Sequence, residues 1–156
     1  MTLQVSFYHL MFTPLEKVLP RIIDKIYASG LRAVVWVEND DVLSKLNTVL
    51  WTYSTLAFIP HGCRLDSEAT KEQQPIWLST TLENPNQSSV CIVTHCQLPH
   101  DLETFGFNRV ADVFDATLTK ATEGGVSFDA RVRFYDQQKA DITQWQQTKE
   151  GWQKLS

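Results

Sequence analysis

With 156 residues, 43% of them hydrophobic and 21% charged, the chain has the composition of one ordinary globular domain. Its formal net charge of −4 argues against a protein that holds duplex DNA by neutralising many phosphates, because that mode needs a broad Lys/Arg surface. The sequence has neither a membrane-length apolar run nor a secretory signal, so we expect a cytoplasmic protein without membrane contact that meets nucleic acid only indirectly.

The N-terminal segment predicts a strand followed by a helix. Residues 3–8 alternate apolar and polar side chains and then become apolar, which indicates a short central strand. In the helix that follows, we expect Thr13 and Glu16 to form a capping box and Gly30 to supply the stop. Pro20 removes a backbone hydrogen bond, so the helix is predicted to be kinked there or to be regular only from that residue onward.

The next segment predicts a second strand and helix. Residues 33–37 are apolar and rich in β-branched side chains, as in a strand covered on both faces. Residues 38–41 are acidic or Asn, and capping of the helix that follows explains them better than an acid–base pair of carboxylates. Residues 51–62 predict an apolar connection, and residues 62–74 a polar, exposed loop.

The remaining sequence predicts further strands and a last helix. Strands are expected at 76–79, 90–94 and 107–114, and a helix at about 117–138. Residues 140–156 are predicted to be an irregular C-terminal tail. This order favours a single-domain α/β fold, an open, mostly parallel twisted sheet with helices on both faces, because right-handed crossovers place helices over a parallel sheet.

Such sheets often bind nucleotides, but the required loop is missing. A phosphate approaches backbone amides closely only where glycines follow the first strand. Residues 9–14 occupy that place with bulky side chains, and the six glycines of the chain form no such motif. We therefore expect a nucleotide-binding-like fold without a phosphate loop and without a cofactor.

A cluster of Cys and His side chains is the other candidate for chemistry. Cys91, His95, Cys96 and His100 have metal-ligand types, but neighbouring strand residues point to opposite faces and their side chains diverge. A buried, reduced Cys91 with surface histidines is the preferred interpretation. A small α/β enzyme that uses Cys96 with His100, or a bound metal, stays open as the alternative.

Two apolar and cationic patches have less obvious structural roles. One is either core or a partner-binding surface, and it consists of Trp51, Tyr53, Phe58, Ile59 and Pro60. The other is either a solvated helix face or a site for an acidic peptide that ends in an apolar residue, and it consists of Arg131, Arg133, Phe134, Tyr135 and Lys139.

Several short strings, taken in order along nearly the whole chain, resemble the chi subunit family of DNA polymerase III. They are Phe7-Tyr8, Leu50-Trp51-Thr52, the segment from Ser54 to Gly62, Gln74 to Leu78, Asn84-Pro85-Asn86, Ala130 to Tyr135, and Trp145 to Trp152. The resemblance implies a subunit without catalysis of its own, which joins the clamp-loader assembly to single-stranded DNA-binding protein.

The resemblance also implies two binding surfaces. Arg131 would bind the acidic, Phe-terminated tail of single-stranded DNA-binding protein, in a pocket completed by Phe114, Arg133, Phe134, Tyr135 and Lys139. A second surface would meet the psi subunit or a helicase partner, through Trp51, Phe58, Ile59, Pro60 and His61. Some relatives carry lysine at the positions of Ser127 and Tyr135, so we expect the tail pocket of this chain to be less basic.

Overall fold

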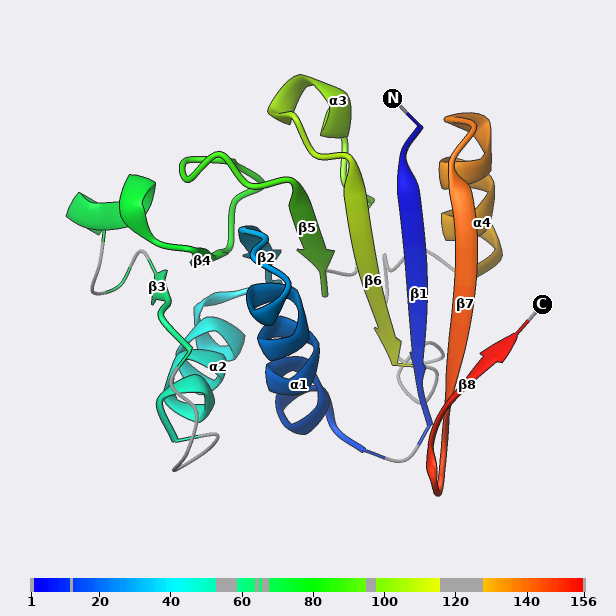
Figure 1. The fold of residues 1–156 in the computed structure, drawn as a ribbon, viewed down its shortest axis with the longest axis horizontal. Helices are drawn as coiled ribbons and strands as arrows, with labels where there is room; N and C mark the ends of the chain where they lie inside the picture. Colours follow the sequence, from blue (N-terminus) through cyan, green and yellow to red (C-terminus); the bar gives the residue numbers. More distant parts are fainter. Residues whose placement is uncertain are drawn as a thin grey trace.

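The computed structural model describes residues 2–11, 13–52, 59–63, 65, 68–94, 98–115 and 128–155. In these residues the chain forms one open sheet of eight strands in the order β3-β4-β2-β5-β6-β1-β7-β8 (Figure 1). Neighbouring strands are parallel except β7 and β8, which form an antiparallel hairpin. The predicted α/β class with an open, mostly parallel sheet is therefore confirmed.

The elements have the following bounds. The strands are β1 Gln4–Leu10, β2 Ala33–Trp36, β3 Gly62–Cys63, β4 Ile76–Ser79, β5 Val90–Val93, β6 Arg109–Asp115, β7 Asp141–Thr148 and β8 Gly151–Leu155. The helices are α1 Leu15–Ala28, α2 Asp40–Thr52, α3 Leu102–Phe105 and α4 Phe128–Gln137, with a 3-10 helix η1 at Glu68–Gln73. No helix in the described parts of the chain is long and apolar enough to cross a membrane.

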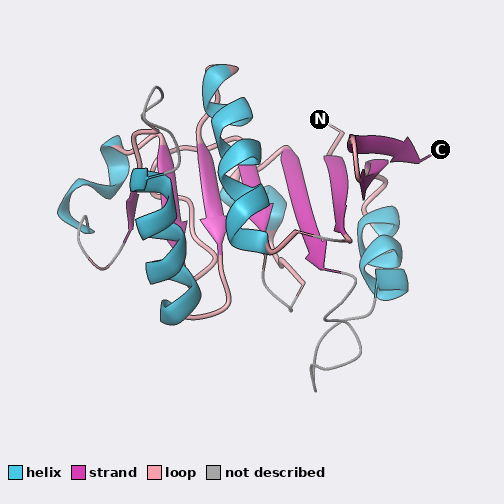
Figure 2. Ribbon diagram, turned by 90° about the horizontal axis from the view of Figure 1, so that it is seen from below, coloured by secondary structure: helices cyan, strands magenta, loops and turns pink. Residues whose placement is uncertain are grey.

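Alternation along the strands builds two apolar cores, one on each face of the sheet. Val35 points to the face covered by α1 and α2, while its neighbours Val34 and Trp36 point to the face that carries α4. Figure 2 shows α1 and α4 on opposite sides of the sheet. On the α1 face, the described helices lie over the β2 side, and the ribbon of β1 and β7 is left open (Figure 1).

Helix ends follow some of the sequence signals and not others. Asn39 caps α2, because its Oδ1 accepts a hydrogen bond from the backbone N–H of Val42 at 3.0 Å. Gly30 follows α1 with a φ of 80°, which favours glycine, so the predicted stop is confirmed. The capping box is wrong, because α1 begins after Pro14 without a side-chain cap. Regularity from Pro20 onward is also wrong, because the helix already includes the five residues before it.

The C-terminal segment and residues 62–74 correct the sequence prediction. The expected irregular tail is a strand hairpin, β7 and β8, and the expected polar loop contains the buried strand β3 and the 3-10 helix η1. Strand β7 is rich in Gln and Thr and has no apolar stripe, so its sequence does not predict a strand. Its order comes from parallel backbone pairing with β1. The last described helix begins at Phe128, and residues 117–127 lie outside the described residues.

The turn after β4 is held by side-chain hydrogen bonds. Asn84 donates from Nδ2 to the carbonyl of Phe105 at 2.7 Å, and Asn86 donates to the carbonyl of Gln74 at 2.7 Å. Glu83 accepts from the indole N–H of the buried Trp77 at 2.9 Å. The Asn-Pro-Asn string that contributes to the family resemblance therefore ties β4, β5 and α3 together.

Gln147 fixes the connection between β1 and α1 to strand β7. Its Oε1 accepts hydrogen bonds from the backbone N–H groups of Met11 at 3.1 Å and Thr13 at 3.2 Å, and its Nε2 donates to Oγ1 of Thr13 at 2.6 Å. The Thr13 hydroxyl, which the sequence predicts as a helix cap, thus serves this contact instead. One amide side chain holds the start of α1 at the edge of the open face.

We predict that Gln147→Ala lowers the free energy of unfolding by about 1–3 kcal/mol, because partly buried backbone N–H groups lose their acceptor. Urea unfolding followed by far-ultraviolet circular dichroism measures the change. Gln153→Ala is the matched control, since Gln153 is an exposed glutamine on β8. Equal losses for the two variants would contradict a role for Gln147 in fixing this connection.

Candidate functional site

Helix α4 positions the cations that the sequence associates with an acidic peptide. Phe128, Val132 and Tyr135 follow the helical period and pack against the core on their face of the sheet. Arg131 lies on the same side of the helix and is buried, with 3% of its surface exposed. Arg133 is exposed. The helical period therefore separates two arginines that are close in sequence.

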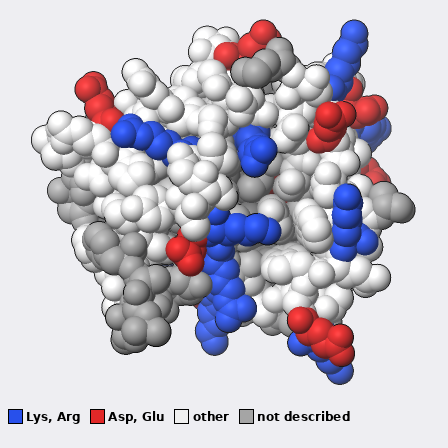
Figure 3. Space-filling model, in the orientation of Figure 1, with Lys and Arg blue, Asp and Glu red and all other residues white. Residues whose placement is uncertain are grey.

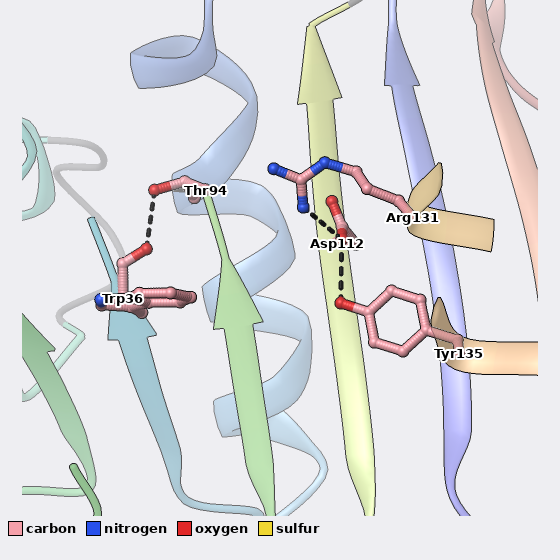
Figure 4. A network of polar contacts seen from close by, with 5 residues as sticks. All are labelled: Trp36, Thr94, Asp112, Arg131 and Tyr135. Atoms are coloured by element: carbon pink, nitrogen blue, oxygen red, sulfur yellow. Dashed lines mark hydrogen bonds and ion pairs between the residues drawn. The ribbon is translucent and has the colours of Figure 1, made fainter. Parts of the chain in front are cut away.

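A buried carboxylate in β6 joins this helix to the sheet. Oδ2 of Asp112 accepts a hydrogen bond from Nη1 of Arg131 at 3.0 Å and another from the hydroxyl of Tyr135 at 3.0 Å (Figure 4). Asp112 is 1% exposed and Tyr135 is fully buried. One carboxylate oxygen thus contacts two successive turns of α4.

The electrostatics of this network follow from its burial. Burial raises the pKa of the Asp112 carboxyl, and the charge of Arg131 and the hydrogen bond from Tyr135 oppose that rise. The pKa of Tyr135 is raised well above its ordinary value, first by burial and then by the negative charge of Asp112. Because arginine stays protonated in proteins, its guanidinium is the group that compensates a buried carboxylate here.

Aromatic rings enclose the network toward the carboxyl end of β1. The ring of Phe7 packs edge-to-face against Phe128 with centroids 5.2 Å apart and against Tyr135 at 5.5 Å. His9 packs against Phe128 at 4.6 Å, and burial lowers the pKa of its imidazole. This apolar wall excludes water from the ion pair and strengthens its electrostatic interaction.

The structure places the residues of the predicted tail pocket at different depths. Arg131 and Tyr135 are inside the protein, Phe134 is half-buried, and Arg133 and Lys139 are exposed. Phe134 contacts the exposed His100, with ring centroids 5.8 Å apart. Phe114 lies on β6 opposite His9, and its side chain is outside the described residues. The outer part of the predicted pocket is therefore Phe134 with the two exposed cations.

The second predicted surface, at the end of α2, also contains both exposed and buried side chains. Trp51 is 53% exposed, and Pro60 is half-buried, whereas the side chains of Ile59 and His61 are buried. Nδ1 of His61 lies 2.8 Å from the carbonyl oxygen of Ile59, and its ring packs against Trp51 with centroids 4.8 Å apart. Phe58 lies outside the described residues. The buried His61, held by the carbonyl of Ile59, thus packs against the exposed Trp51.

The structure describes only part of the Cys and His cluster. Cys91 is buried in β5, and burial raises the pKa of its thiol, so this thiol is a poor nucleophile. His95 and Cys96 lie outside the described residues. Within the described residues, no group of three or more His, Cys, Asp or Glu side chains is arranged to hold a metal ion.

Asp112 is the site residue that the sequence interpretation missed. It stands inside an apolar strand between Ala111 and Val113. A charged residue in such a strand requires a partner, because an isolated buried carboxylate is very costly. That signal was present in the sequence, but it does not identify Arg131 as the partner.

Comparison with known proteins assigns a family to this arrangement. The family described as DNA polymerase III chi subunit, HolC, matches residues 1–144 of the sequence. The chain belongs to the DNA polymerase III chi subunit family. The match includes Asp112 and all of α4, and it ends before the last part of β7 and the whole of β8. The matched region thus contains the residues of the buried network and only the first part of the C-terminal hairpin.

A curated relative agrees with the assignment to the chi family. It is the "Probable DNA polymerase III subunit chi" of Rickettsia prowazekii (strain Madrid E), which is 38% identical over 90 residues. The aligned part is 58% of this chain and 53% of that relative, so the match covers about half of the relative's length. Both comparisons thus lead to the same family, the chi subunit of DNA polymerase III.

We predict that Asp112→Ala destabilises the protein by about 3–5 kcal/mol, because it leaves the guanidinium of Arg131 buried without its carboxylate. Urea unfolding monitored by tryptophan fluorescence gives the value. Asp136→Ala is the matched control, because Asp136 is an exposed carboxylate on the same helix. A loss no larger than that of the control would contradict a structural role for the ion pair.

We also predict a pH signature for Tyr135. Its folded pKa lies well above the unfolded value of about 10, so its contribution to stability is complete below pH ~10 and is lost as the pH rises above that value. The difference in unfolding free energy between the wild type and Tyr135→Phe should be constant from neutral pH to pH ~10 and should then shrink. A difference that begins to shrink near neutral pH would contradict the burial of this phenol.

Proposed function

We propose that this chi family member is a non-catalytic adaptor. It links the clamp-loader assembly of DNA polymerase III to the acidic, Phe-terminated tail of single-stranded DNA-binding protein. The observation that carries the proposal is the family match across residues 1–144, which spans both predicted binding surfaces. The placement of charged and aromatic side chains on α4 gives the proposal a physical basis.

The outer part of α4 suits an acidic peptide that ends in an aromatic residue. Arg133 and Lys139 are exposed cations in a chain with a net charge of −4, and both are near the half-buried Phe134 in sequence. Exposed cations increase the rate of encounter with an acidic tail and make binding sensitive to salt. The rings of Phe134 and His100 offer an apolar contact for the last side chain of the tail.

Arg131 is proposed to determine specificity from the inner end of this site, where 3% of its surface is exposed and a bound tail must displace the side chains that cover its guanidinium. Its hydrogen bond to Asp112 fixes the plane of the guanidinium, and Figure 4 shows that group extending from α4 across β6 in the direction of Thr94 on the β5 side. A planar guanidinium held in one orientation recognises a carboxylate with less loss of entropy than a flexible lysine. Asp112 is then a positioning residue for the tail site.

The second surface is proposed to bind a partner on the polymerase side, either a psi subunit or a helicase. Trp51 is the exposed aromatic of this surface, and it rests on the buried His61 at the end of α2. Exposed tryptophans that rest on a rigid base are frequent anchors of protein interfaces. The second surface is built from α2, on the face opposite α4, so the two partners need not compete.

The tail proposal predicts that Arg131 matters for binding beyond its effect on folding. Replacing only Arg131 would leave Asp112 without its partner, so the variant to test is Arg131→Gln with Asp112→Asn, which removes both charges and keeps polar side chains of similar size. We expect this folded variant to bind a labelled tail peptide at least roughly tenfold more weakly, as for loss of a charge-assisted hydrogen bond. Fluorescence anisotropy measures the affinity.

Matched variants and salt complete that experiment. Arg133→Gln should weaken binding less and lower its salt dependence, and Trp51→Ala should leave tail affinity unchanged. Unchanged affinity for the folded double variant, or equal affinity at low and high salt, would contradict the proposed pocket.

A further inference from the structure

The open face of β1, β7 and β8 carries a set of aromatic side chains that the proposed function does not use. Tyr8 on β1, Trp145 on β7 and Lys154 on β8 occupy directly paired positions on three neighbouring strands. Gln147 and Trp152 form the next cross-strand pair. Paired positions share one face of a sheet, so all five side chains belong to the α1 face. We call these five residues the aromatic face.

The rings of the aromatic face are accessible to solvent, and polar side chains surround them. Trp152 is 36% exposed, Tyr8 and Trp145 are half-buried, and the rings of Tyr8 and Trp152 pack edge-to-face with centroids 5.4 Å apart. The same side of β1 and β7 also presents Ser6 and Thr143, which are directly paired. Aromatic rings among hydroxyl and amide groups differ from the aliphatic centre of a typical protein interface, and they suit flat rings with polar edges.

Cations border the aromatic face on two sides. Figure 3 shows Lys and Arg side chains, with Asp or Glu side chains near them, over α1 and beside β8, and a largely uncharged surface over β1 between them. Helix α1 supplies exposed cations four residues apart, Lys17, Arg21 and Lys25. Arg109 is exposed at the start of β6, and its charge lowers the pKa of the Tyr8 phenol against the larger rise caused by burial.

The hairpin adds a hollow at one end of this surface. It has a volume of about 730 Å³ and is lined by Thr148, Lys149, Glu150, Trp152, Gln153 and Lys154. Trp152 and Lys154 therefore belong both to the aromatic face and to the wall of the hollow. This hollow is open to solvent, and its wall carries two cations, Lys149 and Lys154, and one carboxylate, Glu150.

We propose that the aromatic face binds single-stranded DNA directly, with bases stacked on Trp152 and Trp145 and phosphates paired with Lys154, Arg109 and the cations of α1. Base stacking on aromatic rings needs exposed base faces, which a duplex does not offer, and it adds to the attraction between cations and the phosphates of a single strand. The net charge of −4 therefore argues against broad phosphate binding and leaves this mode open. This inference departs from the expectation that nucleic acid is met only through a partner.

The position of the aromatic face makes it compatible with the proposed tail site. Tyr8 lies on the α1 side of the sheet, and the Asp112 network lies on the α4 side. Trp145, Trp152 and Lys154 all lie beyond residue 144, where the family match ends. Direct binding to single-stranded DNA would thus belong to the C-terminal hairpin of this chain, and tail binding to α4.

The test is fluorescence anisotropy of the full chain with a labelled oligothymidylate of roughly 16 nucleotides, enough for one small binding domain. We expect measurable binding at low salt and much weaker binding to duplex of the same length. Trp152→Ala should weaken the single-strand affinity roughly tenfold, and Trp152→Phe should restore most of it. Lys154→Gln should lower the slope of log affinity against log salt by about 0.7.

Two exposed residues elsewhere give matched controls. Trp51→Ala removes an exposed tryptophan from α2, and Lys139→Gln removes an exposed cation after α4, so neither should change single-strand binding. Each variant is checked by its thermal unfolding, and Trp152→Ala should keep its affinity for the tail peptide. That last result separates failure of this inference from failure of the adaptor proposal.

Three outcomes would overturn the inference. The first is no binding of the wild type to the oligonucleotide at low salt. The second is equal affinity for single strands and duplex, which would indicate phosphate contacts alone. The third is binding that Trp152→Ala and Lys154→Gln leave unchanged, which would place the nucleic acid elsewhere. Self-association that depends on Trp152, seen by sedimentation without nucleic acid binding, would make the aromatic face a protein contact instead.

Discussion

The buried carboxylate of Asp112 is the constraint on which the α4 side of the molecule depends. A charge in the middle of β6 is tolerable only with a guanidinium beside it, and Arg131 provides one at 3.0 Å. Tyr135 contacts the same oxygen one turn later on α4. The requirement to compensate one charge thus sets the position of the whole helix, and with it the placement of Phe134 and Arg133 at the surface.

This constraint also relates stability to recognition. The ion pair that holds α4 in place involves the arginine that the family resemblance assigns to tail binding. A substitution of Arg131 alone would therefore disturb folding as well as any binding, and the double substitution that removes both charges separates the two effects. A buried arginine with a fixed orientation is rigid, and rigidity lowers the entropic cost of recognising a carboxylate.

The two faces of the sheet serve different chemistry. The α4 face holds a closed ion pair under aromatic rings, whereas the α1 face leaves β1 and β7 open beside a hairpin with Trp152 and Lys154. The period of two along a strand makes this separation possible, because Phe7 and Tyr8 point to opposite sides although they are neighbours. A single short strand therefore contributes side chains to both faces of the sheet.

The sequence by itself determined the apolar strands, because Ala33–Trp36, Ile76–Ser79 and Val90–Val93 are buried on both faces and carry that signal in their composition. It also indicated the capped start of α2, where Asn39 accepts a hydrogen bond from the backbone N–H of Val42. Only the tertiary structure decided the C-terminal hairpin, since β7 has mostly polar side chains and is ordered by backbone pairing with a strand far away in sequence. The partner of Asp112 was decided in the same way, because an ion pair between β6 and α4 forms through contacts that no local pattern encodes.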